Sequence, residues 1–255
     1  MTAHHPNSIS AIVCNYNYGE FIYEALDSLA RQTRKPDRLI VVDDGSDDTS
    51  RSVIEKFLAA RGDSFARCDY IRNTRNIGKL ASLNNALALV DTKFSFILDS
   101  DDFIPEHAIA SLLSHLLEAQ QTVPETGFVY SDSYLVDRDG DIIGRGRSAE
   151  WSLERLSTHS YIPECALTVS AALKDAAPFD ETIRVGTKHH KWMRIARDGW
   201  IGRYVDEPLF CYRMHDSNLS GIGRSVLSED DDSGRKDRLL SGYWPVAKSE
   251  EVVPS

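Results

Sequence analysis

Residues 94–102 read FSFILDSDD, an apolar run that ends abruptly in three aspartates. Residues 39–46, LIVVDDGS, repeat this arrangement with two aspartates. Short apolar runs of this kind are typical of buried parallel strands, and open α/β sheets bind their ligands at the carboxyl ends of such strands. Neighbouring carboxylates repel one another unless a cation lies between them. The two acidic clusters therefore predict one pocket for a hard cation and a polar ligand.

The size and composition fit an α/β domain of ordinary globular type. The 255 residues are 42% hydrophobic and 27% charged, and no apolar stretch approaches the roughly 20 residues that span a bilayer. Residues 1–8 lack a basic flank followed by an apolar core, so we expect no signal peptide and a cytoplasmic protein. The net charge of −10 opposes binding to a nucleic acid backbone, so no nucleic acid partner is expected. Peripheral contact with a membrane stays open.

Four cysteines, at positions 14, 68, 165 and 211, are widely spaced in the chain. They form no C-x-x-C pair and have no partnering pair of histidines at zinc-ligand spacing. We therefore expect neither a zinc site nor a disulfide framework, and interpret the cysteines as reduced thiols.

Strands and helices alternate along the first half of the chain. Each of four strand-like runs is followed by apolar residues at helical spacing. The runs are 10–14, 39–42, 70–71 and 94–98. We expect Ser46 to cap the second helix and Pro105 to lie in the first turn of the fourth. This order predicts a mainly parallel sheet with right-handed crossovers.

The second half of the chain indicates a mixed sheet. Residues 127–130 begin another strand, and the Asp-Gly pair at 139–140 between two apolar pairs is a strong signal for a β-hairpin. A helix around Trp192 that ends at Gly199 precedes two more strand-like runs. These runs are 200–205 and 209–212. Residues 221–255 show no periodicity and are expected to form a loosely ordered tail.

Five short motifs lie at or near the predicted strand ends. They are IVCNYN at 12–17 (with QT at 32–33), VDDGS at 42–46, NIG at 76–78, LDSDD at 98–102 and YRMHDSNLS at 212–220. Each is weak alone, but together and in this order they resemble family-two glycosyltransferases, which have the GT-A fold and use nucleotide-sugar donors. The resemblance covers about residues 8–220. It implies an α/β, Rossmann-like fold with a mixed, mainly parallel sheet flanked by helices.

The resemblance also implies a domain organisation. We expect a single GT-A domain over residues 1–220, followed by the tail. Its nucleotide-binding half covers about residues 8–132, and its acceptor-binding half covers about residues 133–220.

The resemblance assigns the donor site to the ends of the first strands. Tyr16 is expected to lay its ring against the nucleobase, although a Tyr that caps the core is the alternative. Asp44 resembles the family carboxylate that accepts from the imide of uracil, which favours a UDP donor. Asp43 is the weaker contact, because one of two adjacent aspartates often turns inward to cap the following loop. The full set of donor-binding candidates is Asn15, Tyr16, Asn17, Asp43, Asp44, Lys79, Asp99, Asp101 and Arg213.

The family pattern places ribose and metal contacts within the D-x-D at 99–102. We expect Asp101, Asp102 and His215 to hold Mn²⁺ or Mg²⁺, which bridges the diphosphate and stabilises the nucleoside diphosphate that leaves. Arg213 is expected to neutralise a phosphate nearby. The alternative is a solvated acidic turn that caps the next helix, for which three carboxylates are more than needed.

One departure from the family pattern concerns the catalytic base. Inverting relatives commonly carry an acidic residue four or five positions before Trp192, where a Thr-Lys pair stands at 187–188. We expect His189 or His190 to take the proton from the acceptor hydroxyl, because an imidazole with a pKa of about 6.5 accepts a proton at neutral pH. Glu164, from another loop, is a weaker alternative. An anionic acceptor or an inactive enzyme also stays open.

These features predict a metal-dependent glycosyltransferase that moves a sugar from a nucleoside diphosphate, with UDP preferred, to an acceptor hydroxyl with inversion. Its partners are a nucleotide-sugar donor and a carbohydrate or glycolipid acceptor, in polysaccharide or glycoconjugate synthesis. One alternative is a sugar-nucleotide-binding protein with impaired catalysis. A nucleotidyltransferase is less favoured, because residues 15–19 lack the glycine- and lysine-rich loop that normally holds a triphosphate. The sugar, the linkage and the oligomeric state stay open.

Overall fold

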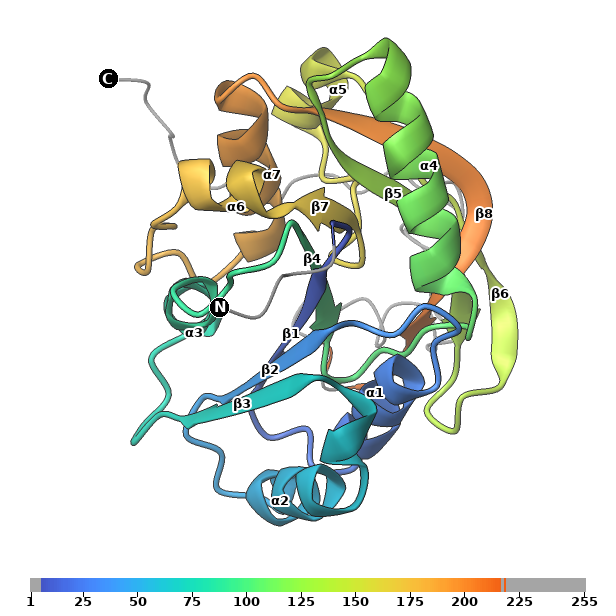
Figure 1. Cartoon of the computed structure of the whole chain (residues 1–255). Helices are drawn as coiled ribbons and strands as arrows, with labels where there is room; N and C mark the ends of the chain where they lie inside the picture. Colours follow the sequence, from blue (N-terminus) through green and yellow to red (C-terminus); the bar gives the residue numbers. More distant parts are fainter. Residues whose placement is uncertain (1–5, 217, 219–255) are drawn as a thin grey trace, which may run out of the picture.

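The apolar runs of the first half form four neighbouring parallel strands in the computed structural model, which describes residues 6–216 and 218. They are β1 (Ile9–Asn15), β2 (Arg38–Asp43), β3 (Arg67–Arg72) and β4 (Phe94–Asp99), in the order β3-β2-β1-β4 (Figure 1). Parallel pairing places Asn15 beside Asp43 and Cys14 beside Asp99. The strand ends that carry the two acidic clusters therefore meet at one edge of the sheet, as predicted.

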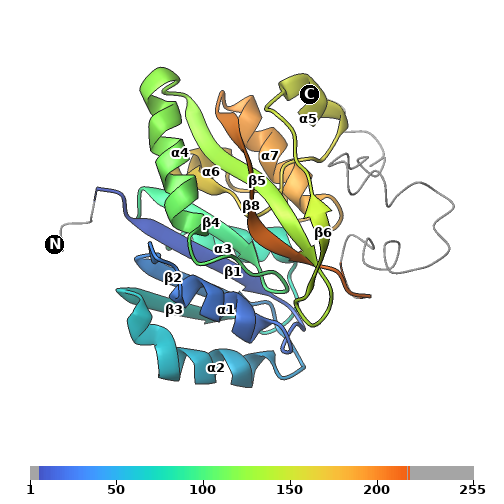
Figure 2. The same ribbon diagram turned by 90° about the vertical axis from the view of Figure 1, so that its right-hand side faces the viewer.

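The second half adds four strands in mixed directions. They are β5 (Thr126–Val136), β6 (Ile142–Gly146), β7 (Leu167–Val169) and β8 (Ile201–Arg213). β7 joins the two halves, since it pairs antiparallel with both β4 and β5. β5 and β6 form the predicted hairpin, and β8 runs parallel to β5. Figure 2 shows β5, β6 and β8 together at one end of the sheet.

The two runs predicted at 200–205 and 209–212 form the single strand β8. The register of β8 against β5 shifts where Ser131 pairs with Val205 and Asp132 pairs with Pro208. Two residues, Asp206 and Glu207, are thus accommodated in an irregularity of the ladder. The apolar pattern is interrupted at Asp206, Glu207 and Pro208, while the strand continues on either side of the irregularity. Pro208 has no N–H to donate, which suits such a break in the ladder.

Helices cover both faces of the sheet (Figure 1). One face carries α1 (Ile22–Ala30), α2 (Ser50–Arg61) and α4 (Ala108–Thr122), and the other carries α3 (Lys79–Leu87), α5 (Leu153–Thr158), α6 (Ser170–Ala176) and α7 (Thr187–Arg197). A short 3₁₀ turn, η1 (Gly62–Ser64), follows α2. Side chains alternate between the faces of a strand, so Ala11 and Val13 pack with the first set while Ile12 packs with the second. The central strands β1, β2 and β4 are mostly apolar because both of their faces are buried.

Two predicted helix starts were wrong. Ser46 does not cap α2, because its hydroxyl hydrogen-bonds to Asp43 and accepts from the backbone N–H of Asn17 at 2.9 Å. Pro105 lies before α4 and outside its first turn, since its carbonyl accepts from Ala108, where the helix begins. The local turn after each strand decides where the helix starts.

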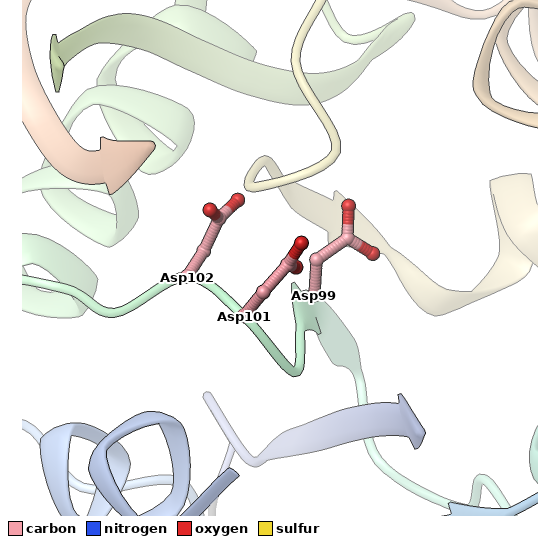
Figure 3. Close-up of side chains that lie close together, drawn as sticks. All are labelled: Asp99, Asp101 and Asp102. Carbon is pink, nitrogen blue, oxygen red and sulfur yellow. The ribbon is translucent and has the colours of Figure 1, made fainter. Parts of the chain in front are cut away.

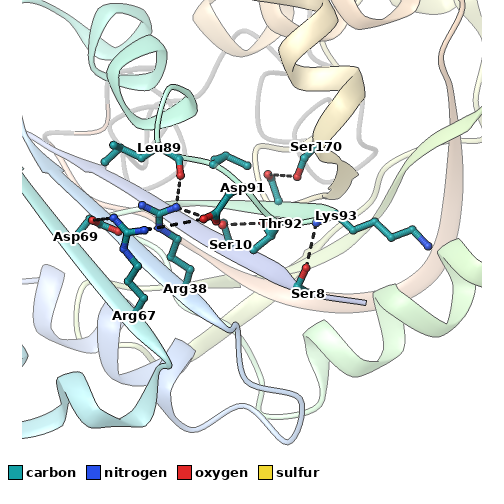
Figure 4. Close-up of polar contacts among 12 residues, drawn as sticks. Ser8, Ser10, Arg38, Arg67, Asp69, Leu89, Asp91, Thr92, Lys93 and Ser170 are labelled. Carbon is teal, nitrogen blue, oxygen red and sulfur yellow. Dashed lines mark hydrogen bonds and ion pairs between the residues drawn. The ribbon is translucent and has the colours of Figure 1, made fainter. Parts of the chain in front are cut away.

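A buried arginine closes the amino-terminal end of the sheet (Figure 4). Arg38 Nε donates to Asp69 at 2.7 Å, and its Nη1 donates to Asp91 at 2.8 Å and to the carbonyl of Leu89. These bonds tie β2 to β3 and to the loop between α3 and β4. They fix the strand order at the end opposite the acidic clusters.

No helix in the described part of the chain is both long enough and apolar enough to cross a bilayer. The expected tail at 221–255 lies outside the described residues. All eight strands belong to one sheet. The single-domain boundary at residue 220 stays a prediction.

Candidate active site

β4 and the turn after it bring three carboxylates to one point (Figure 3). One oxygen from each of Asp99, Asp101 and Asp102 lies within 4.8 Å of the other two. Burial, and then the charges of the other two aspartates, raises the pKa of Asp102 well above its ordinary value. Burial also raises the pKa of Asp99. A half-buried set of hard oxygen ligands that repel one another fits Mg²⁺ or Mn²⁺.

The segment after β8 brings an imidazole to this cluster. His215 Nε2 lies 3.2 Å from Asp101 Oδ2 and 3.1 Å from the side-chain nitrogen of Asn218. The rings of Tyr18 and Phe21 enclose the imidazole, with centroids at 5.5 and 4.8 Å. The sequence analysis missed Tyr18 and Asn218, although Asn218 lies in the last quoted motif and Tyr18 directly follows the first. Ligation of a metal by His215 stays a proposal.

Arg213 has a structural role that differs from the expected phosphate contact. Its buried guanidinium pairs with Glu24, and its Nη1 donates to the carbonyl of Arg138 at 2.6 Å. Its Nε donates to the carbonyl of Asp101 at 2.9 Å, and its backbone N–H donates to Asp102 at 3.0 Å. The side chain thus fixes the turn that carries the acidic cluster. Each of its three nitrogens donates to at least one protein acceptor, which holds the guanidinium against this turn, and the expected phosphate contact stays a prediction.

Asp44 holds the NIG motif against the end of β2. Its Oδ1 accepts from the Asn73 side chain and from the backbone N–H of Ile77, both at 2.9 Å. Its Oδ2 accepts from the backbone N–H of Gly78 at 2.8 Å. A carboxylate offers about four acceptor positions, so about one is left for a uracil imide. The uracil contact stays a hypothesis.

Asp43 turns inward, which is the capping role considered for it from the sequence. It accepts from the hydroxyl and the backbone N–H of Ser46 and pairs with Arg72 at 3.3 Å. The Asn15 side chain donates to the same Ser46 hydroxyl at 3.2 Å. Asp43 and Asn15 therefore hold the loop after β2 in place through their bonds to Ser46.

The loop after β1 offers an open aromatic ring. Tyr16 is 44% exposed, so a ligand can reach its face. Asn17 has a φ of +58°, and its side chain accepts from the backbone N–H of Asp47 at 3.0 Å. Asn tolerates this left-handed conformation better than most residues, and the bond holds the loop that presents Tyr16.

A lysine and a glutamate connect the acidic cluster to the second half of the chain. Lys79, the first residue of α3, donates to Asp99 Oδ1 at 2.5 Å and lies 3.6 Å from Glu164 Oε2. The Oε1 atom of Glu164 accepts from the buried Lys191 at 2.5 Å. Burial alone would raise the pKa of Glu164, but Lys191 and Lys79 outweigh it and lower this pKa to about 2. Glu164 is therefore ionised at neutral pH, with one carboxylate oxygen bound to Lys191.

A small cavity, partly open to solvent, adjoins the cluster. It is lined by Asp99, Asp102, Ser131, Ser133, Leu135, Gly146, Arg147, Ser148, Tyr161, Pro163, Glu164, Lys188, Phe210 and Tyr212. Of the described residues that line the cavity, Lys188 is the one that belongs to α7. Lys188 occupies one of the two positions, 187 and 188, at which the family resemblance implies an acidic residue.

The two candidate histidines are not among the described residues that line this cavity, and their role as catalytic base stays a prediction. Successive helical residues are about 100° apart, so a helix that turns Lys188 to the cavity points His189 and His190 in other directions. His190 Nε2 accepts from the backbone N–H of Asp180 at 3.4 Å, and neither His189 nor His190 is among the described residues that line the cavity. The sequence showed the residue types but not the rotation of α7.

Comparisons with known proteins agree with this architecture. Residues 10–176 match the family model for glycosyl transferase family 2. The chain is 30% identical over 242 residues to an uncharacterized glycosyltransferase of Nostoc sp., covering 88% of this chain and 70% of that protein. It is 23% identical over 226 residues to an uncharacterized glycosyltransferase of Methanocaldococcus jannaschii, covering 86% of this chain and 76% of that protein.

Two solved structures share the fold. S. aureus TarS 1–349 in complex with UDP-GlcNAc has a TM-score of 0.67 at 20% identity, covering 91% of this chain and 70% of that one. The mannosyltransferase PcManGT from Pyrobaculum calidifontis in complex with GDP-Man and Mn²⁺ has a TM-score of 0.64 at 20% identity, covering 88% and 62%. The chain therefore belongs to glycosyl transferase family 2 and is a glycosyltransferase with the mixed, mainly parallel GT-A fold.

Proposed function

We propose that the protein is a metal-dependent, inverting transferase that moves a sugar from a UDP-sugar to an acceptor hydroxyl in polysaccharide or glycoconjugate synthesis. The observation that carries the proposal is the meeting of Asp99, Asp101, Asp102 and His215 at the carboxyl edge of the sheet. Relatives point the same way: TarS has been solved with UDP-GlcNAc, and a Rhizobium meliloti relative at 24% identity is named a succinoglycan biosynthesis protein. We further propose one domain over residues 1–220, with its nucleotide-binding half at about 8–132 and its acceptor-binding half at about 133–220.

The donor would lie across the strand ends. The exposed ring of Tyr16 offers a face to the nucleobase, and Asp44 offers its remaining acceptor position to the uracil imide. The diphosphate would then reach the acidic cluster after β4. Lys79, beside Asp99, supplies positive charge on that side of the site.

Asp101, Asp102 and His215 would hold Mn²⁺ or Mg²⁺. When bound, the cation supplies positive charge to the donor diphosphate and so removes the need for a general acid on the leaving group. The backbone N–H of Arg213 donates to Asp102, its Nε donates to the carbonyl of Asp101, and the Asn218 side chain contacts His215, so these two residues help to hold the ligands in place. The cavity beside the cluster gives the acceptor room next to the transferred sugar.

A second candidate function is a sugar-nucleotide-binding protein with impaired catalysis. It is favoured by Lys188, which lines the cavity where a base is expected. The nucleotidyltransferase alternative is set aside, because the chain belongs to a glycosyltransferase family.

Calorimetry with UDP, GDP and CDP, each with Mn²⁺ and with a chelator, tests the donor proposal. We expect UDP to bind best and to require Mn²⁺, and we expect Asp101→Ala and Asp102→Ala to lose this binding while Asp63→Ala, at an exposed aspartate of η1, retains it. UDP affinity that is the same with chelator contradicts the metal, and preference for GDP contradicts the base assignment. Release of UDP from UDP-glucose or UDP-GlcNAc separates an enzyme from a binding protein.

A further inference from the structure

Glu164, a buried glutamate that lines the cavity, has one carboxylate oxygen without a hydrogen bond in the described part of the chain. Glu164 is 4% exposed and lines the cavity, and its Oε1 is taken by Lys191. Its Oε2 has no hydrogen-bond partner among residues 6–216 and 218. Buried charged oxygens nearly always accept a hydrogen bond, so an exception that lines a cavity points to a ligand that donates one.

The protein holds this carboxylate rigidly. Lys191 binds Oε1 at 2.5 Å and lies over the ring of Trp192, 4.1 Å from its centroid. Trp192 Nε1 donates to the carbonyl of Pro163 at 3.1 Å, and the backbone N–H of Ala166 donates to the carbonyl of Glu164 at 2.8 Å. A side chain fixed from both ends suits recognition, because little freedom is lost when a ligand binds.

Charge decides what kind of ligand atom Glu164 selects. Lys79, Lys188 and Lys191 surround it and keep it ionised. An ionised carboxylate accepts hydrogen bonds and donates none, so Oε2 selects a hydroxyl or an N–H group. In a glycosyltransferase, sugar hydroxyls are the groups that fit.

The position of Glu164 beside the acidic cluster indicates which sugar, donor or acceptor, supplies the hydroxyl. Lys79 Nζ lies 2.5 Å from Asp99 Oδ1 and 3.6 Å from Glu164 Oε2, so a single ammonium group separates Glu164 from the acidic cluster. Asp99, Asp102 and Glu164 line the same cavity. If the diphosphate lies at the cluster, the group attached to it, which is the donor sugar, is the first to enter the cavity.

We propose, resting on the donor site proposed above, that Glu164 Oε2 accepts a hydrogen bond from a hydroxyl of the donor sugar and so helps to select that sugar. A site that binds a substrate hydroxyl with a buried polar group discriminates strongly against an analogue that lacks it. The expected signature is selectivity among UDP-sugars that depends on Glu164, together with an affinity for UDP alone that does not.

The test compares UDP, UDP-glucose, UDP-galactose and UDP-GlcNAc by calorimetry with Mn²⁺, using wild type and Glu164→Gln. We expect the variant to lose at least tenfold affinity for the UDP-sugar that wild type binds best, while its affinity for UDP stays within twofold. Glu154→Gln, at an exposed glutamate of α5, is the matched control and should bind like wild type. A set of deoxy analogues of the best sugar then identifies the hydroxyl: one analogue should bind weakly to wild type and equally weakly to Glu164→Gln.

The outcomes separate this proposal from the one it rests on. If wild type does not bind UDP with Mn²⁺, the proposed function fails. If wild type binds UDP but Glu164→Gln binds every UDP-sugar as wild type does, the Glu164 assignment alone is overturned. If Glu164→Gln loses transfer but keeps its donor affinity, the assignment is also overturned, and Glu164 contacts the acceptor instead of the donor sugar. Since Glu164→Gln leaves Lys191 without its partner, Glu164→Gln/Lys191→Gln removes both charges and keeps the test valid if the single variant does not fold.

Discussion

Replacing Asp102 by asparagine tests whether the acidic cluster is built around a cation. Asparagine has almost the same shape, and its Oδ1 can still accept the hydrogen bond that the Arg213 backbone N–H donates at 3.0 Å. What changes is one negative charge in a cluster whose ligand oxygens lie within 4.8 Å of one another. The variant therefore isolates the electrostatic cost of the cluster.

The magnitude follows from this separation. Two unit charges 4.8 Å apart repel by about 3 kcal/mol at an effective dielectric constant of about 20. Part of this cost is avoided by proton uptake, because the pKa of Asp102 is raised. In the presence of a chelator we expect Asp102→Asn to be about 1–3 kcal/mol more stable than wild type, which is roughly 2–12 °C in Tm.

The pH dependence has a defined sign. A carboxyl with a raised pKa in the folded state binds its proton more tightly there than in the unfolded chain. Wild-type stability in chelator should therefore fall as pH rises above about 4, the ordinary pKa of aspartate, and through the raised pKa of Asp102. Asp102→Asn should show a smaller fall over the same range.

With Mn²⁺ present, wild type should become more stable than Asp102→Asn, which reverses the order of stability expected in chelator. At about 100 times its Kd, a ligand of the folded state adds about 2.7 kcal/mol to the stability of wild type, and Asp102→Asn should lose most of this gain. Thermal unfolding with chelator and with Mn²⁺ measures both effects, with Asp63→Asn as the control. A variant that is less stable than wild type in chelator and gains as much from Mn²⁺ would refute the reasoning.

Three further predictions follow from the site. Tyr16→Ala should weaken UDP binding about 2- to 12-fold, the equivalent of about 0.5–1.5 kcal/mol of ring contact, with little change in stability because Tyr16 is 44% exposed; calorimetry of Tyr16→Phe, expected to match wild type, is the control. His189→Ala and His190→Ala should each keep turnover within about threefold, since neither lines the cavity among the described residues, and a tenfold loss of initial rate in either would support the imidazole base. Arg213→Lys should lower the free energy of unfolding by about 2–3 kcal/mol in urea, because a lysine cannot replace the guanidinium bonds; unchanged stability would argue against the structural role.

Much of the first half of the chain could be predicted because its signals are local. Residues 39–42 are apolar, and so are 94–98 except for Ser95, since both faces of their strands are buried; each run ends directly in aspartates. Parallel pairing then brings the two strand ends together without further information. The sequence therefore predicted the acidic edge of the sheet from short stretches alone.

The remaining features depend on contacts between distant residues or on elements too short to show a period. β7 has three residues, and α5 and α6 have six and seven, so no periodicity is visible there. The role of Arg213 depends on Glu24, 189 residues away, which no local spacing reveals. The rotation of α7, which brings Lys188 to the cavity, depends on how Trp192 packs into the core.

The late position of β8 in the chain has a consequence for synthesis. Asp101 and His215 meet in space although 114 residues separate them, and His215 follows the last described strand. During translation, a chain that has emerged only as far as α7 carries the acidic edge but neither the imidazole nor the Arg213 anchor. The centre is thus completed only when β8 and His215 have emerged and β8 has paired with β5, so polypeptides that end before β8 do not possess it.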